Sequence, residues 1–180
     1  MNLKQYLLNR QDKKRIRKLE AQLQHCGQEI AWVDSKHTHL FGDTISIGNK
    51  VHVFAEPDRH TRLTVYKDQK HQGSINISDY TLISPGVRIE SALKVNIHKA
   101  AMIANHVYIT DCDWHDIYDR SYASIGTPKP VIIEENAWIG YGTIILKGSF
   151  IGKNSIVGAG SVVTGRIPDN VIVAGNPARL

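Results

Sequence analysis

Side chains suited to proton transfer gather in one stretch of the sequence, from Asp111 to about Lys129. His115 lies in this stretch, with Asp111 and Asp113 shortly before it. Histidine titrates near neutral pH and can accept a proton from a weakly acidic group. A nearby carboxylate can orient the imidazole and stabilise its charged form. A histidine in a loop is also often merely solvated, so the residue types alone leave both interpretations open.

Cys112 lies three positions before His115, a spacing compatible with a covalent nucleophile. We favour a small buried thiol beneath the loop, because cysteine commonly packs as a small apolar residue. Cys26 is the other cysteine of the chain. Two cysteines are too few for a disulfide framework and show no CxxC metal spacing, so we expect reduced thiols.

A six-residue repeat occupies the last third of the chain and must position this stretch. The aliphatic residues of the repeat are Ile133, Ile139, Ile145, Ile151, Val157 and Val163. Four positions after each come Ala137, Thr143, Ser149, Ser155, Ser161 and finally Ile167. No helix has this period, which is typical of a parallel β-helix with three hexads in each triangular coil. Residues eighteen apart then stack, as Ile133 with Ile151, and neighbouring coils stabilise one another.

The predicted fold class is therefore all-β, a parallel β-helix with a short helix at its N-terminus. Residues 1–26 are predicted as the helical segment, with Gly27 as its stop, and residues 27–180 as the β-helix domain. Glu56–Gly73 lacks the period and is interpreted as a connecting excursion. Residues 111–130 break the period again and are predicted to protrude as a loop. Loops on a rigid scaffold often carry binding and catalysis.

The composition suits one globular domain of 180 residues, 42% of them hydrophobic and 22% charged. Residues 1–20 hold seven basic and two acidic side chains and account for the net charge of +5. No broad basic surface for nucleic acid is expected. The basic side of the helix is interpreted as a solvated face, with weak contact to an anionic membrane surface as the alternative.

We expect a cytoplasmic protein, with the inner face of the membrane as the alternative location. No stretch approaches the ~20 consecutive apolar residues of a membrane span. The N-terminus also lacks the apolar core of a signal peptide.

Several segments resemble the left-handed β-helix acyltransferases of the hexapeptide-repeat superfamily, most closely the galactoside, maltose and polysaccharide O-acetyltransferases. These segments are Asp111–His115, Lys129–Val131, Asn136–Gly140, Val157–Thr164 and Val173–Pro177. The resemblance covers residues 75–180 well and the first 75 weakly. It implies a homotrimer with acetyl-CoA bound in the cleft between neighbouring prisms, and His115 as general base on the acceptor.

The resemblance also implies roles for individual residues. The catalytic residues would be His115, Asp113 and Trp138, the last as an oxyanion donor or as a packing residue beside the cofactor. The cofactor-binding residues would be Tyr141, Gly142, Ala159, Thr164, Arg166 and Arg179. Arginine suits phosphate because its planar fork makes bidentate hydrogen bonds. The substrate-binding residues would be Ser84 and Arg88. Tyr141 departs from the small residue usual at its position beside the cofactor. Ser84 replaces the usual asparagine, and this substitution leaves the identity of the acceptor open.

The expected function is acetyl-CoA-dependent O-acetyl transfer to a saccharide hydroxyl, in the synthesis of surface polysaccharide, lipopolysaccharide or capsule. Transfer to an amino sugar or a small amine is the main alternative, because N-acetyltransferases share the fold. A zinc enzyme like the γ-class carbonic anhydrases needs converging histidines. The spacing of His98, His106 and His115 does not favour that, and no metal is expected. A non-catalytic scaffold is the last alternative, since fold alone does not fix function.

Overall fold

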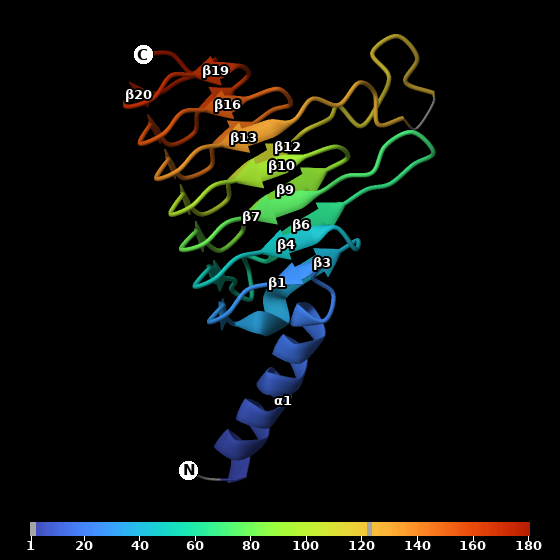
Figure 1. Ribbon diagram of the computed structural model, residues 1–180, viewed down its shortest axis with the longest axis vertical. Coiled ribbons are helices and arrows are strands. Elements are labelled where there is room, and N and C mark those ends of the chain that lie inside the picture. Colours follow the sequence, from blue (N-terminus) through green and yellow to red (C-terminus); the bar gives the residue numbers. More distant parts are fainter. Residues whose placement is uncertain (1–2, 122–123) are drawn as a thin grey trace.

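The computed structural model describes residues 3–121 and 124–180, with side chains from residue 11 onward. Three parallel sheets form the faces of a triangular prism, and α1 (Leu3–Glu20) extends from one end of it (Figure 1). The predicted left-handed parallel β-helix is confirmed. Residues 1–2 of the predicted helical segment and residues 122–123 of the predicted loop lie outside the described residues.

Each coil contributes one short strand to each of three sheets, here called A, B and C. Sheet A contains β1 (His25–Cys26), β4 (Ile45–Ile47), β7 (Ile75–Ile77), β10 (Val95–Ile97), β13 (Val131–Ile133), β16 (Phe150–Ile151) and β19 (Arg166–Ile167). Sheet B contains β2 (Ala31–Val33), β5 (His52–Phe54), β8 (Leu82–Ile83), β11 (Met102–Ile103), β14 (Trp138–Ile139), β17 (Ile156–Val157) and β20 (Ile172–Val173). Sheet C contains β3 (Thr38–Phe41), β6 (Thr61–Val65), β9 (Arg88–Ser91), β12 (Tyr108–Thr110), β15 (Ile144–Ile145) and β18 (Val162–Val163). A short 3₁₀ turn, η1 (Ser35–His37), precedes β3.

The hexad pattern explains both the core and the corners of the prism. The aliphatic residues of the last six hexads are at most 1% exposed. Ile133 pairs in parallel with Ile151, as the eighteen-residue spacing predicts. The small residues sit at the corners, where a hydroxyl can donate back along the chain, as Ser149 Oγ does to the Leu146 carbonyl at 2.6 Å. A buried hydroxyl at a corner is thereby satisfied without widening the coil.

The N-terminal helix ends earlier than predicted, at Glu20. Its last turn covers the open end of the prism, where Leu19 is buried and Trp32 donates its indole N–H to the Glu20 carboxylate at 3.3 Å. Within the described residues, no helix is both long and apolar enough to cross a membrane.

The first coil begins before the predicted boundary, because β1 at His25–Cys26 already pairs with β4. Gly27 is therefore not the helix stop. A side chain there would meet the backbone of Gly48 at 2.2 Å, so Gly27 is required by the close contact of two coils.

The interpretation of Glu56–Gly73 as an excursion is wrong in its middle. Residues 61–65 form β6, which pairs with β3 and β9 and buries Leu63 completely. Only alternate positions of a strand face the core, and the outward residues Arg62 and Thr64 are polar. The strand is therefore difficult to recognise from the sequence.

Two loops leave the prism at the edge between sheets C and A, after β6 and after β12 (Figure 1). The second is the predicted loop of residues 111–130. The rings of Tyr66 and Trp114 lie 4.3 Å apart, so the two loops touch at their bases.

Candidate functional site

Asp111 anchors the start of the protruding loop. It is completely buried, and its two oxygens accept hydrogen bonds from the backbone N–H groups of residues 92–94 at 2.6 to 2.9 Å. The Ser91 hydroxyl adds another at 2.7 Å. Residues 92–94 form a corner at which the six-residue spacing of the core aliphatic residues is lengthened by two residues. Both carboxylate oxygens of Asp111 are used in these bonds. The prediction that Asp111 could orient the His115 imidazole is therefore wrong.

Asp113 also has a partner other than histidine. It forms an ion pair with Lys147, whose ammonium group donates a second hydrogen bond to the Thr127 carbonyl at 3.0 Å. The pair links the two arms of the loop to the coil that follows β15. The side chain predicted to orient His115 therefore fixes the loop, and no hydrogen bond joins it to His115 among the described residues.

His115 is exposed on the loop, directly after a residue held in an unusual conformation. Trp114 has a φ of +68°, which is rare for a bulky side chain. Its indole N–H donates to the Tyr108 hydroxyl at 3.3 Å, and its ring packs on Tyr66. Strained residues of this kind persist only where their surroundings hold them, and they cluster at functional sites.

The hydroxyl of Tyr108 continues this contact into sheet C. It donates to Glu90 at 2.7 Å, and Arg88 donates its Nε to the other oxygen of Glu90 at 2.7 Å. The carboxylate of Glu90 is buried. Burial and the bond to Glu90 raise the pKa of Tyr108, which keeps the hydroxyl protonated as the donor. A continuous set of contacts thus runs from Arg88 to the residue before His115.

Trp138 lies far from this set within one chain. It faces outward from sheet B and is 48% exposed. Sheet B is the face opposite the edge from which the loop with His115 projects. One chain therefore does not bring these two predicted catalytic residues together.

The predicted cofactor residues fall into two groups. Tyr141, Gly142 and Ala159 lie at the corner between sheets B and C, where Gly160 N–H donates to the Tyr141 carbonyl at 2.8 Å. Gly142 has a φ of +64°, a conformation that favours glycine. The ring of Tyr141 lies 5.4 Å from that of His106 at the same corner.

The second group lines a pocket of about 510 Å³ at the C-terminal end of the prism. Thr164, Arg166 and Arg179 all contribute to its wall. The Arg166 guanidinium lies 3.9 Å from the centre of the Phe150 ring, a cation–π contact. Two arginines beside an open pocket suit an anionic ligand group.

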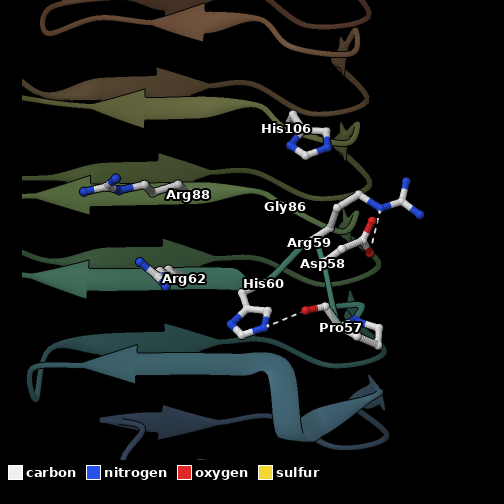
Figure 2. Close-up of a pocket in the computed structure, with 8 residues that line it drawn as sticks. All are labelled: Pro57, Asp58, Arg59, His60, Arg62, Gly86, Arg88 and His106. Atoms are coloured by element: carbon white, nitrogen blue, oxygen red, sulfur yellow. Dashed lines mark hydrogen bonds and ion pairs between the residues drawn. The ribbon is translucent and has the colours of Figure 1, made fainter.

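Of the two predicted substrate residues, Arg88 lines a pocket. This pocket, of about 390 Å³, lies on the outer side of sheet C near its corner with sheet B (Figure 2). Ser84 lies just after β8, and its carbonyl accepts a hydrogen bond from the Thr61 hydroxyl at 3.3 Å.

Cys112 is placed as expected for a structural thiol. It is buried, and burial raises its pKa to about 11. A thiolate is the nucleophilic form of cysteine, so Cys112 is poorly suited to a covalent step near neutral pH.

The three histidines weighed for zinc lie at three different edges of the prism. His98 follows β10, His106 follows β11, and His115 lies beyond β12. Zinc ligands must converge on a point, which this arrangement prevents.

Comparison with known proteins agrees with the fold and the repeat. Residues 130–165 match the family model "Bacterial transferase hexapeptide (six repeats)". A galactoside O-acetyltransferase of Escherichia coli (strain K12) is 30% identical over 152 residues, 84% of this chain and 60% of the relative. A 2,3,4,5-tetrahydropyridine-2,6-dicarboxylate N-acetyltransferase of Clostridium perfringens (strain SM101 / Type A) is 51% identical over 51 residues, 28% of this chain and 22% of the relative.

Solved structures extend the match along the chain. The hexapeptide-repeat containing acetyltransferase VCA0836 from Vibrio cholerae has a TM-score of 0.62 and 25% identity, covering 89% of this chain and 73% of that one. The chain carries the repeat of this family in residues 130–165 and shares the fold of a hexapeptide-repeat acetyltransferase along most of its length. The N-acyltransferase AntD from Bacillus cereus, as its S84C mutant with dTDP-4-amino-4,6-dideoxyglucose and coenzyme A, shares the hexapeptide-repeat fold at a TM-score of 0.71 and 20% identity, covering 93% and 86%. The chain spans 60% or less of the two relatives compared by sequence.

Sequence reasoning missed the residues that hold the loop of this hexapeptide-repeat protein. Glu90, Tyr108 and Tyr66 come from three different coils. The bond of Tyr108 to Glu90 and the packing of Tyr66 on Trp114 cannot be seen in any local motif. One signal was available. Glu90 faces outward from β9 next to a break in the period, a position where a buried carboxylate needs a partner.

Proposed function

We propose that this chain is an acetyl-CoA-dependent O-acetyltransferase that acts on a saccharide hydroxyl, in the synthesis of surface polysaccharide, lipopolysaccharide or capsule. The observation that carries the proposal is His115, exposed on a loop whose adjoining Trp114 is fixed by two aromatic partners. A fixed base beside an open surface is what a hydroxyl acceptor needs. The similarity to a galactoside O-acetyltransferase supports the same reaction.

In the proposed reaction His115 takes the proton of the acceptor hydroxyl as its oxygen attacks the thioester carbonyl. The new C–O bond gives a tetrahedral intermediate, whose oxyanion accepts a hydrogen bond from the Trp138 indole or a backbone N–H near Gly142. The C–S bond then breaks, and the imidazolium returns its proton to the departing thiolate. Asp113 serves indirectly, by holding the loop through Lys147.

Acetyl-CoA fits the two groups of residues at the C-terminal half of the prism. Arg166 and Arg179 would bind phosphates at the end pocket, by charge-assisted hydrogen bonds. The corner formed by Tyr141, Gly142 and Ala159 would line the pantetheine arm. AntD, which shares the fold, is a complex with coenzyme A in its solved structure.

The proposed active form is a homotrimer. His115 and Trp138 lie on opposite sides of one chain, so a second copy must supply one of them if both act together. Apolar side chains face outward in register along sheet B at Leu82, Met102, Trp138, Ile156 and Ile172. An exposed apolar strip of this kind is typical of a subunit interface. Two unpaired cysteines fit a cytoplasmic location.

Thiol release from acetyl-CoA over a panel of sugars, nucleotide sugars and glycan fragments tests the reaction. We expect acceptor-dependent release, with a product that mild alkali cleaves because it is an ester. An alkali-stable product formed only on amino sugars would show N-acetyl transfer in its place. A protein that neither binds acetyl-CoA nor releases thiol with any acceptor would contradict the proposal.

A further inference from the structure

The outer face of sheet C carries two arginines in direct register. Arg62 on β6 pairs with Arg88 on β9, and both side chains point along the same side of the sheet (Figure 2). Like charges at directly opposite positions on neighbouring strands are destabilising. Arg88 is balanced by Glu90, whereas Arg62 has no ion-pair partner among the residues that the structure describes. An anion bound between the two guanidinium groups would offset the unbalanced positive charge of Arg62.

The two arginines open onto the pocket of about 390 Å³. His106 lines the same pocket, and Figure 2 shows both arginine side chains extending along their strands away from it. The other basic groups in the pocket are already engaged. His60 contacts the Pro57 carbonyl and His39, and Arg59 pairs with two carboxylates. The donors available to a ligand between the two strands are therefore Arg62 and the Nη1 group of Arg88, whose Nε and Nη2 are bonded to Glu90.

His39 on β3, which pairs with Arg62, also lies in a positively charged surrounding. Burial lowers the pKa of His39, and the nearby His60, Arg62 and His37 lower it further. A site that disfavours a further positive charge is one in which a bound anion is favoured.

The pocket is connected to both proposed parts of the active site. Arg88 leads through Glu90 and Tyr108 to Trp114, next to His115. His106 meets Tyr141 at the proposed cofactor corner. The phosphates of the cofactor have their own arginines near β18 and β19, about 14 Å along the prism from β9 at three strand spacings of ~4.8 Å. The pocket is thus placed for the acceptor.

We propose that this pocket binds an anionic group, a carboxylate or a phosphate, carried by the saccharide acceptor. Arg62 and Arg88 would hold the anion between them. This inference rests on the proposed function for the identity of the ligand as acceptor. The binding of the anion itself does not require acetyl transfer.

The test is calorimetric titration of the full chain, without acetyl-CoA, using three probes at fixed ionic strength. The probes are trigalacturonate, glucose 1-phosphate and neutral maltotriose. We expect saturable binding of one anionic sugar and none of maltotriose. Binding of trigalacturonate alone identifies a carboxylate, and binding of glucose 1-phosphate alone identifies a phosphate.

Arg62→Gln should weaken the binding at least tenfold, because it removes the guanidinium group that has no ion-pair partner among the described residues. Arg17→Gln, which removes the same charge from exposed α1, should change it less than twofold. Circular dichroism confirms that both variants fold. The inference is overturned if neither anion binds, if maltotriose binds equally well, or if the two variants lose binding alike.

The outcomes separate this inference from the proposed function. Acetyl transfer to neutral sugars without any anion binding would overturn the inference and leave the function standing. Anion binding lost in Arg62→Gln, in a protein that transfers no acetyl group, would support the pocket and contradict the function.

Discussion

Asp111 and Asp113 hold the backbone on either side of Cys112, and the proposed reacting group of this stretch is His115. Asp111 satisfies three backbone N–H groups at a corner, and Asp113 pairs with Lys147. Each of these roles could be assigned only once the partners were known, because they lie 17 to 34 positions away in the sequence. The residue types near His115 indicated chemistry. They could not distinguish a carboxylate that orients a base from one that orders a corner.

Asp111→Ala should lower the free energy of unfolding by about 3 kcal/mol or more, since three buried N–H groups lose their acceptor. Chemical denaturation measures this change. Asp119→Ala is the matched control, because Asp119 is exposed and its carboxylate accepts hydrogen bonds from nearby Ser121. Equal stability of the two variants would show that Asp111 is not the anchor of the loop.

Cys112 should react very slowly with a thiol reagent in the native protein. With a pKa of about 11, only about one thiol in a thousand is ionised at pH 8. The raised pKa means that the reaction should accelerate as the pH rises toward that value. Cys26→Ser isolates Cys112 for measurement with Ellman's reagent, before and after unfolding. Rapid labelling of the native variant at pH 8 would contradict the structural role.

The loop is the element on which the proposed function depends, and contacts from three coils hold it. Tyr108 joins the indole of Trp114 to the buried Glu90, and Tyr66 packs against the same indole. These contacts explain how Trp114 keeps a φ of +68° next to His115. We therefore propose Tyr66, Tyr108 and Glu90 as positioning residues for His115.

Tyr108→Phe should lower kcat about tenfold, because it removes both hydrogen bonds that fix Trp114 and Glu90. The KM for acetyl-CoA should stay unchanged, since the proposed cofactor residues lie elsewhere. Tyr118→Phe, in the same loop but 87% exposed, is the control. A change confined to KM, or a kcat equal to that of the control, would contradict the positioning role.

At the scale of elements, the sequence predicted best where burial repeats most regularly. The hexads from Ile133 to Val163 form strands in the expected register, because each aliphatic residue must enter the same column. The prediction missed β6, where two neighbouring loops interrupt the count. The contacts that fix the loop of residues 111–130 could not be predicted, because they depend on which coils become neighbours.

At the scale of the whole molecule, one chain offers only part of the proposed active site. The loop with His115 and the outward face of sheet B point to opposite sides of the prism. Three copies around an axis would bring the loop of one against the exposed strip of the next. The apolar residues of that strip would then be buried, which explains why a protein of this size exposes them.

Met102→Glu should convert the proposed trimer to a monomer, because it places a charge within the apolar strip on sheet B. Analytical ultracentrifugation measures the mass in solution. Phe41→Glu, which changes an exposed apolar residue on sheet C, should remain trimeric. Wild-type protein that sediments as a monomer would rule out the shared site.

The most direct test of the central claim is the rate of acetyl transfer by His115→Ala, measured with an acceptor that the wild-type protein uses. We predict a fall of about 10² to 10⁴ in rate, the usual contribution of a general base, with acetyl-CoA binding and the trimer unchanged. His98→Ala, at another edge of the prism, should keep wild-type activity. Equal rates for wild type and His115→Ala would contradict the role of His115 as the base, and so would loss of cofactor binding in that variant.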